Sequence, residues 1–234
     1  MELSIVIPAY NEENRIGPTL KKICKYLRNN KKIKKWEILV IDDGSKDKTR
    51  EIVKQFIKKE KRIKLNEKRK NEGKGFSVRE GALMSKFSNV LFTDADLSTP
   101  IEELNNFIPY SDNYDIIIGS RSLKESNIKE HQPKYREIMG KIFNFSVRII
   151  TGLDIKDTQC GFKLFKNCKE LFLEQKIKGF SFDVELLYLA FKKKKRILEL
   201  PVTWINSKKS KVNPIKDSIK MFFDILKIKY LHKN

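Results

Sequence analysis

Two aspartates separated by a single residue follow a short apolar segment near the middle of the chain. Residues 90–92 (VLF) are typical of a strand buried on both faces, and Asp94 and Asp96 come soon after this segment. Two carboxylates at the end of a buried strand are costly unless a positive group neutralises them. Carboxylate oxygens suit Mg²⁺ and Mn²⁺, and these ions often share their coordination shell with phosphates. The pattern therefore predicts a divalent metal that holds a phosphorylated ligand.

An alternative role for the same two aspartates is to cap the helix expected after Pro100. Ser98 and Thr99 precede this proline directly, and hydroxyl side chains are common helix N-caps. Because these hydroxyls can fill the capping position, the metal-binding interpretation of the aspartates is favoured. An Asp-x-Asp pattern is weak evidence alone, and its meaning depends on the surrounding segments.

The composition is that of a globular protein with a strong basic bias. The 234 residues are 40% hydrophobic and 34% charged, and 50 Lys and Arg against 30 Asp and Glu leave a net charge of +20. This charge favours anionic partners such as nucleic acid, acidic lipid or phosphorylated substrates. A lysine-rich solvated surface explains it equally well. The 3 cysteines form no C-x-x-C pair and there are only 2 histidines, so no zinc cluster is expected and the cysteines fit a reducing compartment.

Short apolar segments alternate along the chain with segments of helical periodicity. Such alternation is typical of a mostly parallel, Rossmann-like α/β sheet with helices on both faces. Strands are expected at residues 3–8, 36–41, 62–66, 90–92, 116–118 and 197–204. Helices are expected at residues 16–27, 47–57, 75–87, 101–107, 135–150 and 181–192, with a last amphipathic helix after Pro214. Between them, residues 123–133 are expected to be polar and mobile, and residues 157–162 to form a polar loop.

The carboxyl ends of the strands in such a sheet lie along one edge, where ligands bind. That edge is expected to gather Tyr10, Glu12, Asp43, Asp94, Asp96 and Arg121. The chain enters its first strand at once, so no signal peptide is expected. No apolar stretch approaches the ~20 residues of a membrane span.

Several segments near this edge have two possible roles. The glycine-rich turn at residues 71–75 can bind phosphate through backbone N–H groups at a helix start, or it can simply open the helix. Asp43 can accept a hydrogen bond from a base or ribose, but Asp-Gly is also a common turn. Arg121 can bind a diphosphate or pair with the acidic edge. Asp183 and Glu185 can supply a general base or begin a helix as a cap with a first-turn acid, and the cap is slightly favoured.

Five strings taken together resemble a known family. The order P-A-Y-N-E (residues 8–12), D-D-G-S (42–45), N-E-G-K-G (71–75), D-A-D (94–96) and G-S-R (119–121) resembles family 2 glycosyltransferases with the GT-A fold. Within that family, D-A-D-L-S-T-P and D-T-Q-C-G-F-K-L-F (157–165) resemble the dolichyl- or polyprenyl-phosphate glucosyltransferase branch. The resemblance covers roughly residues 1–205.

The resemblance implies a role for each matching residue. The nucleotide sugar would be bound by Pro8, Tyr10, Glu12, Asp43, Lys74 and Asp94, with Asp43 facing the base. The residues implied in catalysis are Asp96, Arg121, Arg136, Asp157 and Gln159. Asp96 would bind Mg²⁺ or Mn²⁺ on the diphosphate, with Ser98 as a poorer second ligand. Arg121 and Arg136 would lie near the diphosphate and the acceptor phosphate, and Asp157 and Gln159 in the acceptor-side loop.

The implied reaction is an inverting transfer of a hexose, most simply glucose from UDP-glucose, to a polyprenyl or dolichyl phosphate. A lipid phosphate is already ionised near neutral pH, so no general base is needed. A saccharide hydroxyl as acceptor would need one, for which Asp183 and Asp157 are candidates. Mannosyl relatives often carry glutamine at the position of Ser98, so this serine favours a glucosyl donor. A non-catalytic nucleic-acid-binding protein is a third reading of the charge, but no RNP-like string supports it, and no nucleic acid is expected as a partner.

The expected organisation is one GT-A domain at residues 1–212, with a nucleotide-sugar half at about 1–121 and an acceptor half at about 122–212. The helix within residues 213–234 either belongs to this domain or lies at a membrane interface. Its apolar residues are Ile215, Ile219, Phe222, Phe223, Leu226 and Tyr230, and they alternate with Lys216, Lys220, Lys227 and Lys229. A lipid acceptor favours the interface, so the chain is expected at the cytoplasmic face of an anionic membrane, as a peripheral protein.

Overall fold

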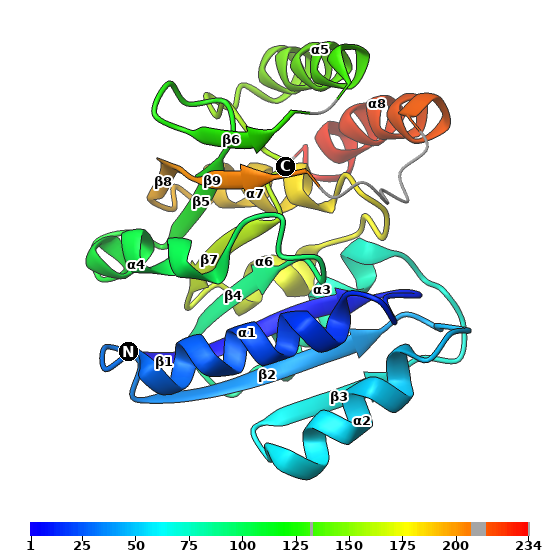
Figure 1. Cartoon of the computed structure of the whole chain (residues 1–234). Helices are drawn as coiled ribbons and strands as arrows, with labels where there is room; N and C mark the ends of the chain where they lie inside the picture. Colours follow the sequence, from blue (N-terminus) through cyan, green and yellow to red (C-terminus); the bar gives the residue numbers. More distant parts are fainter. Residues whose placement is uncertain (132, 207–213, 234) are drawn as a thin grey trace.

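A mixed sheet of seven strands runs through the centre of the computed structural model (Figure 1). The structure describes residues 1–131, 133–206 and 214–233, with the backbone alone for residues 214–218. The strands of this sheet are β1 (Glu2–Ala9), β2 (Lys35–Asp42), β3 (Ile63–Glu67), β4 (Asn89–Thr93), β5 (Ile116–Ser120), β7 (Phe162–Lys166) and β8 (Ile197–Pro201). Their order is β3-β2-β1-β4-β7-β5-β8, and only the pairings of β7 are antiparallel. The expected α/β fold with a mostly parallel sheet is confirmed.

Helices cover both faces of the sheet. They are α1 (Ile16–Asn29), α2 (Thr49–Lys59), α3 (Lys74–Met84), α4 (Leu104–Phe107) between the short 3₁₀ turns η1 (Ile101–Glu103) and η2 (Ile108–Tyr110), α5 (Lys134–Thr151), α6 (Lys169–Glu174), α7 (Phe182–Lys192) and α8 (Pro214–Leu231). The helix expected at residues 75–87 ends at Met84, and the one expected at residues 101–107 is a series of short turns.

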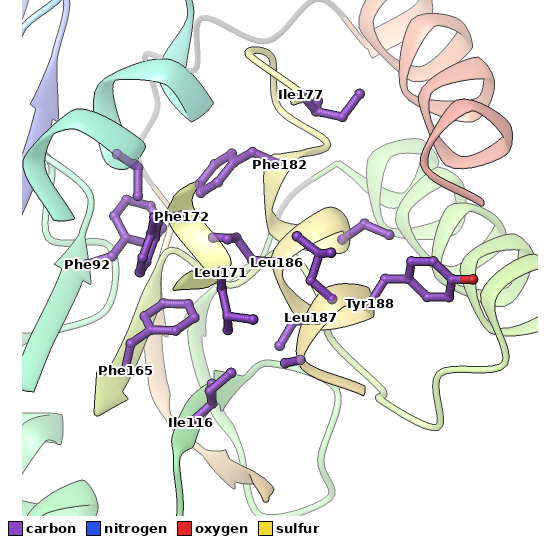
Figure 2. Packing of buried hydrophobic residues seen from close by; sticks show 14 of the residues in the cluster. Phe92, Ile116, Phe165, Leu171, Phe172, Ile177, Phe182, Leu186, Leu187 and Tyr188 are labelled. Atoms are coloured by element: carbon purple, nitrogen blue, oxygen red, sulfur yellow. The ribbon is translucent and has the colours of Figure 1, made fainter. Parts of the chain in front are cut away.

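Side chains alternate along β1 between two apolar cores, as the period of a strand requires. Leu3, Ile5 and Ile7 pack with α1, α2 and α4 on one face of the sheet. Val6 points to the other face, which α3, α6 and α7 cover and where α5 and α8 join the same core. In this second core Phe92 meets Phe182 edge to face with ring centroids 5.6 Å apart (Figure 2). The strand that precedes Asp94 is therefore fixed directly to the start of α7.

Strand β7 differs from the expectation of a polar loop that runs into apolar residues. It lies between β4 and β5 and runs antiparallel to both, so that Leu164 pairs with Leu91 and with Ile117. Its sequence, F-K-L-F, places Lys163 inside the protein with no exposed surface. The lysine is stable there because Asp183 on α7 neutralises it, a partner that the sequence does not place beside it.

Two further segments depart from the expectation. Residues 127–130, expected to be polar and mobile, form β6 (Asn127–Glu130), which pairs with β9 (Thr203–Ile205) in a separate two-stranded sheet. The single strand expected at residues 197–204 divides after Pro201, at the end of the edge strand β8. A proline is suited to this place because it cannot donate a hydrogen bond to a neighbouring strand.

Helix α8 has one buried face and one exposed apolar face. Met221, Ile225 and Ile228 are buried in the second core. The exposed face carries Ile219, Phe222, Phe223, Leu226 and Tyr230, whereas the side chains of Ile215 and Lys216 lie outside the described residues. Two polar contacts also anchor the helix, from Ser181 to Asp224 at 3.1 Å and from His232 to Glu185 at 2.8 Å. No helix among the described residues is long and apolar enough to span a bilayer.

We expect Ile225→Ala to lower the free energy of unfolding by about 2–5 kcal/mol, because it removes a fully buried side chain from the core beneath α8. The matched control is Phe223→Ala on the opposite face, where the side chain is 63% exposed and the change should stay within about 0.5 kcal/mol. Urea unfolding of the two variants measures both values. Equal losses would show that α8 does not pack as described.

Candidate functional site

The carboxyl edge of the sheet collects the polar segments that follow the strands. β1, β2, β4 and β5 end at this edge, and antiparallel β7 begins there. Residues 157–161 therefore reach the same edge as the D-A-D turn, although they precede a strand rather than follow one. This arrangement places the two halves of the chain side by side.

Asp94 is held by residues from two other segments. Its Oδ1 accepts an ion-paired hydrogen bond from Lys74 Nζ at 2.6 Å, and its backbone N–H donates to the Gly161 carbonyl at 3.3 Å. A Cβ on Gly161 would overlap the Asp94 carboxylate, so a larger residue here would displace that carboxylate from its present place. Burial alone would lower the pKa of Lys74, but Asp94 and Asp183 raise it above its ordinary value. The amine beside Asp94 is thus kept protonated.

Asp96 presents a partly exposed carboxylate next to Asp94. Its Oδ1 accepts from the Ser98 N–H at 3.0 Å, and its Oδ2 lies 3.9 Å from the Arg15 guanidinium. No group of three His, Cys, Asp or Glu residues in the described part of the chain is arranged to hold a metal. Mg²⁺ usually takes only one or two carboxylates and completes its shell with substrate phosphate and water. Asp96 with the hydroxyl of Ser98 fits that kind of donor set.

Two residues expected at the nucleotide have protein partners in this structure. Asp43 accepts from the backbone N–H groups of Glu72 and Gly73, both at 2.9 Å. Glu12 accepts from Arg15 at 2.6 and 2.9 Å. Asp43 therefore fixes the glycine-rich turn to the end of β2. Pro8 lies near the end of the neighbouring strand β1, and Tyr10 follows that strand directly. The nucleotide roles of these residues stay predictions.

The glycine-rich turn meets a packing requirement of its own. Gly73 has a φ of 107°, which favours glycine, and a Cβ there would collide with the Lys178 carbonyl. Gly75 is equally confined by Phe182 and the 177–179 backbone. The two glycines thus allow the start of α3 to pack closely against the residues that lead into α7. Opening the helix in this way is the simpler of the two roles considered for the turn, the other being phosphate binding.

Arg121 and Asp157 form a bidentate ion pair at the acceptor-side loop. Arg121 Nε lies 2.7 Å from Asp157 Oδ2 and Nη2 lies 2.8 Å from Oδ1. Burial would raise the pKa of Asp157, but Arg121 more than offsets this and lowers it from 3.8 to about 2. The backbone N–H of Asp157 in turn donates to Glu199 at 2.7 Å. Arg121 therefore pairs with the acidic edge, and it also lines the cavity described below.

The ion pair between Lys163 and Asp183 was not predicted from the sequence. Lys163 Nζ donates to Asp183 Oδ1 at 2.7 Å and to the Cys160 carbonyl at 2.5 Å. Burial raises the pKa of Asp183, against the opposing effect of Lys163 and Lys74. Asp183 and Glu185 lie in the first turn of α7, as expected, but Asp183 does not cap the helix, and both side chains are buried. A lysine inside F-K-L-F and two acids inside an otherwise apolar helix were the available signals.

A cavity of about 960 Å³ opens between this edge and α5. Five of the residues implied by the resemblance line it, namely Lys74, Arg121, Arg136, Asp157 and Gln159. Pro8, Tyr10, Glu12, Asp43, Asp94, Asp96 and Ser98 do not line it. Six cationic side chains face three carboxylates in its wall: Lys74, Arg121, Arg136, Lys141, Arg148 and Lys156 against Glu137, Asp157 and Asp183. The wall is therefore suited to an anionic ligand.

Comparisons with known proteins show the family of the chain. Residues 4–170 match the model of the family described as Glycosyl transferase family 2. A dolichyl-phosphate beta-glucosyltransferase of Dictyostelium discoideum is 37% identical over 243 residues, covering 97% of this chain and 74% of the relative. The human protein of the same name is 32% identical over 246 residues, covering 98% of this chain and 76% of the relative.

Solved structures show the same fold at lower identity. Glucosyl-3-phosphoglycerate synthase from Mycobacterium tuberculosis, in complex with Mn²⁺, UDP and glucosyl-3-phosphoglycerate, superposes with a TM-score of 0.68 at 16% identity, covering 97% of this chain and 77% of that one. Staphylococcus aureus TarS in complex with UDP-GlcNAc gives a TM-score of 0.63 at 20% identity, covering 97% and 66%.

The Arg121–Asp157 pair should make the free energy of unfolding depend on pH in the acidic range. Because the pKa of Asp157 falls from 3.8 to about 2 on folding, its carboxylate stabilises the fold above pH 3.8, and this is lost as the pH falls toward 2. The difference corresponds to about 2 kcal/mol. We expect Asp157→Asn to lose less stability than the wild type in urea unfolding between pH 5 and pH 2. Asp154→Asn, at an exposed ion pair, is the control. Identical losses in Asp157→Asn and the wild type would contradict the lowered pKa.

Proposed function

The chain belongs to glycosyl transferase family 2, and we propose that it transfers glucose from UDP-glucose to a polyprenyl or dolichyl phosphate, with inversion at the anomeric carbon. The observation that carries the proposal is the cation-rich cavity beside the D-A-D edge. An acceptor phosphate placed there would be stabilised by Arg121 and Arg136, and its oxygen would attack the sugar from the side opposite the diphosphate. The names of the relatives support the same donor sugar and acceptor.

The acid–base chemistry of the site also supports a phosphate acceptor. A phosphate oxygen is ionised near neutral pH and needs no base. Asp157, one of two candidate bases, has a pKa of about 2 and takes up protons poorly. Its pairing with Arg121 instead suits it to orient that guanidinium.

A saccharide hydroxyl is the second candidate acceptor, and one observation favours it. Asp183 lines the cavity, and burial raises its pKa, as expected of a general base. The pairing of its Oδ1 with Lys163 opposes this role, because the ammonium stabilises the carboxylate against protonation. The phosphate acceptor is therefore the better explanation of the site.

The donor side of the site requires charge stabilisation on the leaving diphosphate. Asp96 and Ser98 would hold Mg²⁺ or Mn²⁺, which supplies positive charge to the diphosphate when bound. Lys74 is protonated at the boundary between Asp94 and the cavity and would add to this stabilisation. Asp43 would contribute indirectly, by holding the glycine-rich turn at residues 71–75 in place. Pro8, Tyr10 and Glu12 would complete the nucleotide side.

A lipid acceptor brings the chain to a membrane surface. Of the 15 exposed large hydrophobic side chains in the described residues, 11 lie on α5 and α8. On α5 they are Tyr135, Ile138, Ile142, Phe145 and Ile149, which recur every three or four residues along one stripe. The two helices lie side by side at one end of the molecule (Figure 1). We propose that this face binds an anionic bilayer, and that α8 belongs to the same folded unit as residues 1–206.

We place this surface at the cytoplasmic side, because three cysteines are buried as free thiols and suit a reducing compartment. Residues 1–121 would then supply the nucleotide-sugar half of the site and residues 122–206 the acceptor half. Most of the cavity wall comes from α5, β6 and the 156–159 loop, and Lys74 and Arg121 of the first half complete it.

Purified protein should transfer radiolabelled glucose from UDP-glucose to a polyprenyl phosphate in the presence of Mn²⁺ or Mg²⁺. Asp96→Asn should reduce this transfer at least about 100-fold with little change in melting temperature, because a neutral amide binds a hard cation poorly. Full activity of Asp96→Asn in saturating Mn²⁺ would remove Asp96 from the metal site. Transfer to saccharides alone would establish the second candidate acceptor.

The wild type should bind anionic liposomes at low salt and release them as salt rises, because each lysine near such a surface contributes about 1 kcal/mol. Replacing Phe222 and Phe223 with Ser should weaken binding without unfolding the protein, since these side chains are 43% and 63% exposed. Leu173→Ser, at a 59% exposed site on α6, is the control and should not change it. Co-sedimentation with vesicles measures all three. If the wild type does not bind liposomes at low salt, the proposal that α5 and α8 form a membrane-binding surface is excluded.

A further inference from the structure

Two consecutive peptide groups lead into Asp157, and polar side chains bond each of them on both sides. Glu199 of β8 accepts the backbone N–H groups of Lys156 at 3.0 Å and of Asp157 at 2.7 Å. Asn144 of α5 donates from its amide to the carbonyl groups of Ile155 at 3.1 Å and of Lys156 at 2.7 Å. The loop that contains Asp157 is therefore held between a strand of the sheet and a helix of the cavity wall.

The side-chain amide of Asn144 is committed to this loop in one orientation. Its Oδ1 accepts from the Thr158 hydroxyl at 3.3 Å, while its Nδ2 reaches the two carbonyl groups. Turning the amide over would set its oxygen against those carbonyl oxygens, so the partners fix its orientation. Asn144 lines the cavity, but both hydrogens of its amide are used within the chain. Its role is therefore to hold the loop and not to donate to an anionic ligand.

Helix α5 supplies a rigid base for this contact. Asn144 lies between Phe143 and Val147, whose side chains are buried in the second core. Another contact joins α5 to the residues before the loop, from Arg148 to Asp154 at 2.7 Å. Both of its side chains are exposed, and exposed ion pairs contribute little to stability. The position of the loop relative to α5 therefore depends mainly on Asn144.

The position of this loop decides where Arg121 lies. Asp157 accepts from the Arg121 backbone N–H at 2.9 Å and from its guanidinium at 2.7 and 2.8 Å. The backbone on either side of Asp157 is fixed in turn by Asn144 and Glu199. A displaced loop would therefore carry Asp157, and with it the guanidinium of Arg121, to a different place in the cavity wall.

We propose that Asn144 is a positioning residue for the acceptor: through the loop, it sets the place at which Asp157 presents the guanidinium of Arg121 to the acceptor phosphate. This inference rests on the proposed function and adds to it a residue that the resemblance did not name. The exposed apolar stripe of α5 belongs to the face proposed to bind the bilayer. One helix thus fixes both the bilayer surface and the guanidinium that receives a phosphate anchored in that bilayer.

Asn144→Leu tests this role, because leucine keeps the branched shape of asparagine but cannot form its three hydrogen bonds to the loop. We expect this variant to raise the KM for geranyl phosphate about tenfold or more, because a small displacement of a substrate-binding group has a large effect. The Kd for UDP-glucose, measured by calorimetry, should match that of the wild type. Hydrogen exchange over residues 155–159 should be faster, because the peptide groups before Asp157 are then held from one side only.

A double-mutant cycle separates positioning from a general loss of structure. If Asn144 acts through Arg121, Asn144→Leu should weaken geranyl phosphate binding, measured by calorimetry, less in an Arg121→Lys background than in the wild type. Ser146→Ala is the matched control on the same helix, because that hydroxyl donates to the Ile142 carbonyl within α5. The control should change neither binding nor hydrogen exchange. Asn144→Ala removes the same hydrogen bonds and replaces the leucine variant if that one folds poorly.

Unchanged hydrogen exchange in a folded Asn144 variant overturns the positioning role. Equal losses of binding in the wild-type and Arg121→Lys backgrounds do so too, because Asn144 would then act independently of Arg121. If the wild type transfers glucose to geranyl phosphate and the Asn144 variant does so equally well, only the positioning role fails. If the wild type binds UDP-glucose but neither binds nor glucosylates geranyl phosphate, the proposed function fails with it.

Discussion

The seating of β7 between β4 and β5 is the constraint on which the site depends. This strand carries Lys163 into the interior, where an unpaired ammonium would be far too costly. Asp183 and the Cys160 carbonyl satisfy it. Since the carboxylate comes from α7, the positive charge of the strand and the negative charge of the helix neutralise each other. The loop that leads into β7 is thereby fixed across the D-A-D turn.

Two more ion pairs of the same kind lie along this edge. Lys74 pairs with Asp94, and Arg121 pairs with Asp157. Each joins segments that are distant in the sequence, and each pairs opposite charges in a partly buried place. A diphosphate that reaches Lys74 would exchange one anionic partner for another, so the lysine keeps its proton throughout. Pre-formed charges of this kind need little reorganisation when a ligand binds.

The sequence was informative wherever local pattern decides the structure. The apolar residues of β1 and β4 and the polar residues after them predicted the strands, the parallel sheet and the edge that holds Asp94 and Asp96. The pattern failed where the structure of a segment depends on a partner that is distant in the sequence. Lys163 made β7 look unlike a buried strand, because its partner is 20 residues away on another element.

The same limit applies to single side chains in the site. The nucleotide role of Asp43 stays a prediction, but its oxygens also accept backbone N–H groups of residues 72 and 73, which local sequence does not bring to it. The periodicity of α8 described one apolar face, whereas Met221, Ile225 and Ile228 form a second that only the packing against α5 and α7 reveals.

The position of β7 also affects synthesis on the ribosome. β4 and β5 emerge first, and until β7 follows each has an open edge that can pair with another chain. In the interval between the emergence of β5 and that of β7, the nascent chain therefore has open strand edges that a chaperone can protect.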